Sequence, residues 1–303
     1  MTGEPVDTPY SQEEDESFSV YDYVFDDGYD ESEDYIEDEY ARAHENTHGD
    51  EEEPGNDIAG EPGNTAADPD NEHFQIYSIE GTTGNLNADS WERQLAWRDN
   101  AVLLAEQYRD IIKINMSPSE NVVYLTFDDG PDQNNTVSVI NTLIEYGVSA
   151  TFFFTGENME RHSNVVRQAF DAGFAIGLHG YAHASFQELT ADEITAELKE
   201  SNDILEAITG ERASTMRPPY GAVGEDEIST ISELDLKIYL WSLDTFDWAQ
   251  TDSDEILRNI KDYLRPGEII LMHAFSGQKL VPEILPEIIE FIRDEGFEMR
   301  ALP

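Results

Sequence analysis

Two aspartates stand side by side directly after an apolar segment, where residues 122–127 are followed by Asp128-Asp129-Gly130-Pro131. Adjacent carboxylates repel each other, and a bound cation relieves that repulsion because it ligates one of them and lowers its proton affinity. The other carboxylate can then act as a base. The same four residues are also a good turn sequence, so this stretch alone leaves a simple turn as an equal alternative.

His179 and His183 are four residues apart, a spacing that can bring two imidazoles to one cation. Together with one carboxylate they would form a His₂-Asp set, which leaves positions open for water and substrate and therefore suits a catalytic metal site. The alternative is one core histidine and one surface histidine. A second pair, His44 and His48, matches the H-E-x-x-H zinc pattern. Its flanks are acidic and lack an apolar helix face, so we interpret that match as a coincidence.

Three further groups could complete an active site. His273 follows another apolar segment and suits general-acid work because an ordinary imidazole titrates near neutrality. Asp247 could orient and charge it. Arg217 could keep Asp128 ionised or could merely cap a helix end. Trp248 could form a wall beside a substrate, although a tryptophan is more often a packing residue.

The elements that must position these residues alternate between strand and helix. Seven apolar or β-branched segments predict strands, at 122–127, 150–154, 174–178, 215–217, 237–241, 268–272 and 297–301. Helical spacing is found at 88–112, 136–146, 165–172, 190–208, 225–234, 254–264 and 281–295. Asp89 or Ser90 could cap the first helix, and Thr190 with Glu193 forms a capping box. Such alternation predicts an α/β fold with a mainly parallel sheet that closes, or nearly closes, into a barrel; an open doubly wound sheet is the alternative.

The carboxyl ends of parallel strands meet on one edge, where functional groups of such folds lie. Five of the predicted strands are followed by ionisable residues, so we expect these residues to face one rim. This convergence strengthens the catalytic interpretation of each one.

Acidic residues are concentrated in the first part of the chain. Residues 1–72 hold 26 Asp and Glu residues against one Arg, which predicts an acidic, low-complexity and disordered tail. Residues 73–120 are expected to form a helical extension, and residues 121–303 a catalytic domain. The formal net charge of −49 argues against nucleic acid as a partner. There is no cysteine, which excludes disulfides and thiolate metal sites. No segment is apolar enough to span a membrane, and no signal peptide is visible at the start.

Residues 121–303 resemble the polysaccharide deacetylases of carbohydrate esterase family four, the NodB-homology domain. The resemblance is carried by five motifs in order: Thr126-Phe-Asp-Asp-Gly130, His179-Gly-Tyr-Ala-His183, Arg217-Pro-Pro-Tyr220, Asp244-Thr-Phe-Asp247-Trp248 and Leu271-Met-His273. Two positions depart from the family pattern. Gly180 replaces the usual Ser or Thr, whose hydroxyl braces the loop, and Ala184 replaces a common Pro.

The resemblance implies a distorted seven-stranded (β/α) barrel and a role for each site residue. Asp128 would be the base, and Asp129, His179 and His183 would hold a divalent metal, most often Zn²⁺ in this family. A metal-activated water would attack an acetyl carbonyl. The remaining implied roles are the backbone N–H of Tyr220 for the oxyanion, His273 as the acid tuned by Asp247, Arg217 orienting Asp128, and Trp248 and Leu271 bordering the acetyl pocket.

The family acts on acetylated glycans, which implies removal of N-acetyl groups from N-acetylglucosamine-containing glycans such as peptidoglycan or chitin-type oligomers. It also implies an extracellular or cell-surface location, and we expect a monomer. Two alternatives stay open: a deacetylase of O-acetyl esters or small amides, and a catalytically weak glycan-binding protein on the same fold.

Overall fold

The computed structural model describes residues 74–275, 277 and 279–303. The predicted acidic tail and the His44/His48 pattern lie outside the described residues. In the described part, one sheet has the strand order β1-β6-β5-β4-β3-β2-β8-β7, with β9 paired to β2, and all paired strands run parallel. Its strands are β1 (Ile112–Lys113), β2 (Val122–Asp128), β3 (Thr151–Phe154), β4 (Ala175–Leu178), β5 (Thr215–Met216), β6 (Lys237–Tyr239), β7 (Leu243–Asp244), β8 (Ile269–His273) and β9 (Glu298–Met299).

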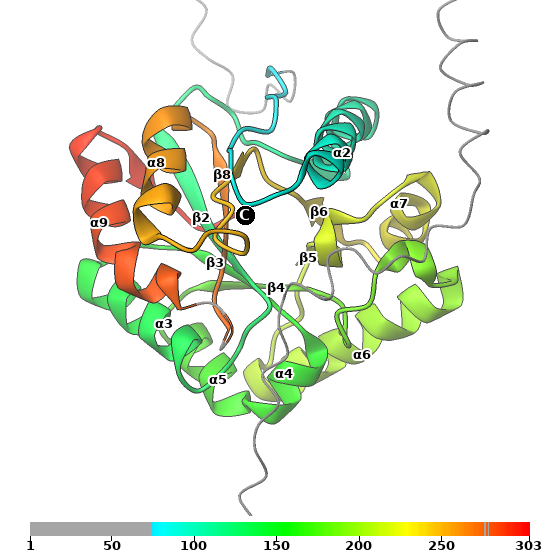
Figure 1. Cartoon of the computed structure of the whole chain (residues 1–303). Helices are drawn as coiled ribbons and strands as arrows, with labels where there is room; N and C mark the ends of the chain where they lie inside the picture. Colours follow the sequence, from blue (N-terminus) through cyan, green and yellow to red (C-terminus); the bar gives the residue numbers. More distant parts are fainter. Residues whose placement is uncertain (1–73, 276, 278) are drawn as a thin grey trace, which may run out of the picture. The chain divides into compact units, whose positions relative to one another are not determined.

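The predicted α/β barrel is confirmed, and the sheet curls as Figure 1 shows. At one edge of the sheet, Asn115, which follows β1, forms an isolated antiparallel bridge with Glu268 just before β8. All seven predicted strands are present, with bounds shifted by a few residues. Strands β1 and β7, of two residues each, were not predicted, and residue 112 of β1 lies at the end of the predicted helix 88–112.

Helices surround the curled sheet (Figure 1). They are α2 (Ala88–Gln107), α3 (Asn135–Tyr146), α4 (Gly156–Arg161), α5 (Ser163–Asp171), α6 (Ala191–Thr209), α7 (Glu225–Ser232), α8 (Ser253–Tyr263) and α9 (Leu280–Asp294). Every predicted helix is present and the Thr190 capping box is confirmed. The first helix was predicted too long, since residues 112–113 pair with β6 instead. Its cap was also wrong: Asn87 accepts the N–H of Ser90.

Strand β2 is the centre of the sheet and six of its seven residues are buried. A strand buried on both faces reads as a continuous apolar segment, which explains why residues 122–127 do not alternate. The rings of Phe127 and Phe152, on β2 and β3, stack at 5.3 Å. On the other side β8 pairs with β2 so that Asp128 and His273 are register partners. The central strand therefore delivers Asp128 to the rim beside His273.

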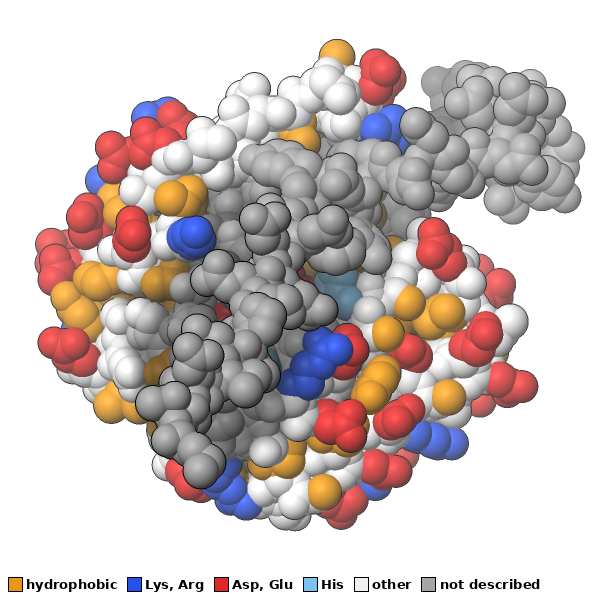
Figure 2. Space-filling view, turned by 60° about the horizontal axis from the view of Figure 1, so that its bottom comes forward, with side chains coloured by type: hydrophobic (Ala, Val, Ile, Leu, Met, Phe, Trp, Pro, Cys, Tyr) orange, Lys and Arg blue, Asp and Glu red, His pale blue; other side chains and the backbone are white. Residues whose placement is uncertain are grey.

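Acidic side chains are scattered over the visible face of the described residues and outnumber the Lys and Arg side chains there (Figure 2). In that same part of the chain, no helix is long and apolar enough to cross a membrane.

Candidate active site

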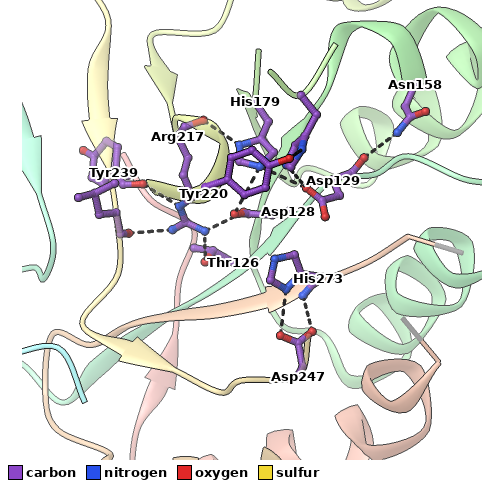
Figure 3. Close-up of polar contacts among 12 residues, drawn as sticks. Thr126, Asp128, Asp129, Asn158, His179, Arg217, Tyr220, Tyr239, Asp247 and His273 are labelled. Atoms are coloured by element: carbon purple, nitrogen blue, oxygen red, sulfur yellow. Dashed lines mark hydrogen bonds and ion pairs between the residues drawn. The ribbon is translucent and has the colours of Figure 1, made fainter. Parts of the chain in front are cut away.

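Asp129, His179 and His183 come together at the carboxyl ends of β2 and β4. The Asp129 Oδ1 atom lies 3.2 Å from Nε2 of His179 and 3.0 Å from Nε2 of His183. Asp129 and His183 both have left-handed backbone conformations, with φ of 74° and 59°. Such conformations are costly for residues with a side chain and tend to be kept where function needs them. The predicted His₂-Asp cluster is thus assembled in space (Figure 3).

The cluster has the chemistry of a divalent cation site. Nδ1 of His179 lies 2.7 Å from the carbonyl oxygen of Arg217, which can only accept, so Nδ1 carries the proton and Nε2 presents a lone pair. That lone pair faces Asp129 Oδ1, a buried oxygen that makes no hydrogen bond. Tetrahedral coordination with bonds of about 2.0–2.1 Å separates ligand atoms by roughly 3.3 Å. The observed distances of 3.0 and 3.2 Å are close to that spacing, so the residues fit a metal such as zinc.

Electrostatics favour ionised Asp129. Burial alone would raise the pKa of this carboxyl, but the positive charge that His183 can carry and the close contacts with both imidazoles hold the pKa well below its usual range. The same attraction outweighs burial at His183 and raises its pKa. Asp129 is therefore ionised, and an ionised carboxylate is a suitable oxygen ligand for a divalent cation.

Asp128 is buried and is held by Arg217, which donates from Nη1 to Oδ1 over 2.7 Å. Arg217 itself is fully buried, and its other donors reach the hydroxyl of Thr126 and the carbonyls of Tyr239 and Leu240. With its donors satisfied in this way, the guanidinium has one orientation, which fixes Oδ1. The second oxygen, Oδ2, faces the cluster 3.9 Å from Nε2 of His179.

His273 stands on the other side of Asp128, at the end of β8. The carboxylate of Asp247 accepts from both the backbone N–H of His273, at 2.8 Å, and its Nδ1, at 2.9 Å. Burial lowers the pKa of His273. The negative charge and hydrogen bond of Asp247, and to a smaller extent the charges of Asp129 and Asp128, outweigh burial and raise the pKa to about 10. The imidazole is therefore protonated at neutral pH, and Figure 3 shows its ring between Asp247 and the two aspartates.

The other predicted site residues lie nearby, and their roles stay predictions. Tyr220 has φ of 61° and its hydroxyl is 3.2 Å from Nδ1 of His183. Trp248 is half-buried against Phe246, with ring centroids 5.3 Å apart. Leu271 is buried in β8, two residues before His273.

Sequence reasoning missed the contribution of helix α2. Trp97 donates from its indole to the carbonyl of Gly221 over 3.1 Å and stacks on Trp241 at 4.8 Å. Gly221 has φ of 65°, and an added Cβ would lie 2.6 Å from the Trp97 ring, so only glycine fits. Trp241 in turn packs against the guanidinium of Arg217 at 5.5 Å. No motif marks Trp97, because its partners are about 120 to 140 residues away in sequence.

Two other residues were also missed, Thr126 beneath Arg217 and Asn158 on α4. Asn158 donates to the backbone carbonyl of Asp129 over 2.8 Å and supports its left-handed conformation. Thr126 could have been suspected, since a polar residue in a doubly buried strand needs a partner.

The curled parallel sheet, with acid–base groups gathered on the rim at its carboxyl ends, defines a hydrolase of the (β/α)-barrel class. The family model described as polysaccharide deacetylase matches residues 115–239. A peptidoglycan-N-acetylglucosamine deacetylase of Bacillus cereus is 34% identical over 183 residues, which cover 60% of this chain and 66% of that protein. The match thus spans just under two thirds of that relative.

Solved structures agree. The Bc1960 peptidoglycan N-acetylglucosamine deacetylase, crystallised with an N-oxidanyl-benzamide, superposes with a TM-score of 0.63 at 31% identity and covers 66% of this chain and 94% of its own. A pseudoenzyme of carbohydrate esterase family four from Bacillus anthracis superposes with a TM-score of 0.59 at 25% identity, covering 63% of this chain and 67% of its own. This chain belongs to the polysaccharide deacetylase family.

Proposed function

We propose that this protein removes N-acetyl groups from N-acetylglucosamine-containing glycans, such as peptidoglycan or chitin-type oligomers, outside the cell or at its surface. One observation carries the proposal. A carboxylate held by Arg217 and an imidazole held by Asp247 are register partners on adjacent strands, beside a cluster suited to a divalent metal. These residues are suited to act as base, acid and ligands, which favours an enzyme over a protein that only binds glycans.

The chain's own residues account for the proton transfers. Asp129, His179 and His183 would hold a divalent ion, zinc by family resemblance, which would supply Lewis-acid chemistry that polarises a carbonyl and acidifies water. Asp128 removes a proton from the attacking water, and Arg217 holds that carboxylate in its orientation through a hydrogen bond to Oδ1. His273 then donates a proton from Nε2 to the departing nitrogen. The backbone N–H of Tyr220 is proposed to stabilise the developing oxyanion.

The amide is favoured over an ester as the bond that breaks. An amine is a poor leaving group unless it is protonated. The pKa of His273 is raised to about 10, so this imidazole carries a proton near neutral pH and can donate it to the departing nitrogen. The alkoxide that departs from an ester depends less on protonation by a general acid such as His273. O-acetyl esters and small amides are therefore the alternative substrates to be compared with N-acetylated glycans.

Substitution of the acid and the base tests the proposal. Asp128→Asn and His273→Ala should each lower acetate release from chitin oligomers or peptidoglycan by about 10²–10⁴-fold, the usual contribution of general acid–base catalysis. Metal binding, measured by elemental analysis, should survive in both. Asp262→Asn, an exposed change of the same type as Asp128→Asn, is the control and should leave both properties unchanged. Unimpaired acetate release in either site variant would show that the assigned roles are wrong.

A further inference from the structure

The loop between the two histidines is held by a side chain from helix α6. The Glu197 carboxylate accepts the backbone N–H of Tyr181 over 2.6 Å and that of Ala182 over 3.0 Å, both through Oε2. These two N–H groups lie between His179 and His183 in the chain. A negatively charged acceptor makes hydrogen bonds about twice as strong as a neutral one. The carboxylate therefore ties the middle of this loop to a long helix.

The carbonyls of the same loop are also satisfied. The Gly180 oxygen accepts from the backbone of Gly156 and from the hydroxyl of Ser201, each at 2.9 Å. The Tyr181 oxygen accepts from the backbone of Glu157 at 3.0 Å. Ser201 stands four residues after Glu197 on α6, so one face of that helix supplies both side chains. The loop is fixed from two sides although it has no regular secondary structure of its own.

The residue at position 180 explains why this arrangement is needed. Gly180 has φ of 70°, where a residue with a side chain is strained, and a Cβ there would lie 3.4 Å from Oε2 of Glu197. The Ser or Thr typical of the family at this position carries the hydroxyl that braces the loop. Gly180 cannot provide one. The space beside it is taken by the Glu197 carboxylate.

We propose that Glu197 is a positioning residue that replaces the missing hydroxyl and holds His179 and His183 in the geometry that binds one cation. The inference rests on the metal site in the proposed function. Residues that support ligands from behind typically change metal affinity by 10–100-fold when removed. Without Glu197, two backbone N–H groups would lose their acceptor, and the loop would have to be ordered when the ion binds.

Metal titration of the chelator-treated protein tests this. Zn²⁺ binding is measured by isothermal titration calorimetry for the wild type, Glu197→Ala and Glu197→Gln. Glu197→Ala should bind Zn²⁺ at least tenfold more weakly. Glu197→Gln keeps one amide oxygen as an acceptor and should fall in between. Circular dichroism of each apo protein checks that the fold is kept, and the Gln variant serves if the Ala variant does not fold.

Glu200→Gln is the matched control. Glu200 is exposed and lies one turn further along α6, and its replacement by Gln removes the same negative charge. It should bind Zn²⁺ as the wild type does. Affinity of Glu197→Ala within twofold of wild type, an equal loss in Glu200→Gln, or a wild type that binds no Zn²⁺ would each overturn the proposal. Acetate release is not used here. A wild type that binds Zn²⁺ but releases no acetate would refute the proposed function while leaving the role of Glu197 standing.

Discussion

His273 and Asp247 form the pair whose protonation the mechanism depends on. The pKa of His273 is raised to about 10 in the folded protein, against an ordinary value near 6.5. A raised pKa means that the charged pair stabilises the fold fully below pH 6.5, and that this contribution is lost as the pH rises through about 10. In the proposed mechanism this proton is the one offered to the leaving amine, so we expect activity also to decline on the alkaline side of the pH–rate profile.

Asp247→Asn should move the alkaline limb of the pH–rate profile to lower pH. An amide removes the negative charge that raises the pKa of His273, while burial, which lowers it, stays. We expect the alkaline limb of kcat/KM to shift down by at least one pH unit and kcat at neutral pH to fall at least tenfold. The measurement is a pH–rate profile of acetate release from a chitin oligomer. An alkaline limb at the wild-type position would mean that His273 is not the acid or that Asp247 does not set its charge. Asp262→Asn, exposed and equal in charge change, is the control.

At the residue scale, the sequence predicted the residues that the structure gathers at the candidate site, but not most of the residues that hold them in place. Asp128, Asp129, His179, His183 and His273 could be found because each follows a strand in a short recognisable motif. Glu197 and Trp97 could not. Their contacts depend on how a helix packs, and helix packing leaves no local pattern beyond an apolar face.

At the scale of elements, α2 is part of the wall behind the site. Its Trp97 holds Gly221, next to Tyr220, and its Arg98 donates to the Gly81 carbonyl and packs over the Phe246 ring at 5.3 Å. These contacts reach both the arginine motif and the aspartate motif. The predicted extension 73–120 also contributes strand β1 to the sheet. We therefore propose that the extension is a required part of the catalytic unit.

Trp97→Phe is the test at this scale. The phenyl ring keeps the stack on Trp241 but cannot donate to Gly221, so we expect kcat to fall about three- to tenfold with KM little changed. Loss of one hydrogen bond should lower the free energy of unfolding by only about 1 kcal/mol. Acetate kinetics and urea unfolding measure the two effects. Leu103→Ala, on an exposed face of the same helix, should change neither rate nor KM. A Trp97→Phe enzyme with wild-type kcat would show that α2 packs on the site without positioning it.

Elements were predicted better than their ends. The strand–helix alternation is a strong signal because each period is set by burial, and it located all seven predicted strands. Two short strands, β1 and β7, and the end of α2 were not predicted. Strand β7 has two residues, and the end of α2 is decided by the pairing of Ile112 with Ile238, a contact across more than a hundred residues.

At the scale of the whole molecule, the charge of the protein is strongly negative, and the candidate site is one that could bind a cation. The chain carries a formal charge of −49, and Figure 2 shows acidic side chains scattered over the described surface. Such a field concentrates cations near the protein and repels polyanions. It therefore agrees with a divalent metal and argues against nucleic acid as a partner.

The central claim is that Asp129, His179 and His183 hold a divalent metal that the deacetylation requires. The most direct measurement is acetate release from N-acetylglucosamine oligomers by the protein before chelator treatment, after it, and after Zn²⁺ is added back. The account predicts that activity is lost when the metal is removed and is restored by about one equivalent of Zn²⁺. The control Asp262→Asn should lose and recover activity as the wild type does. Acetate release that continues undiminished in the metal-free protein, or that never appears in the Zn²⁺-loaded protein, would contradict it.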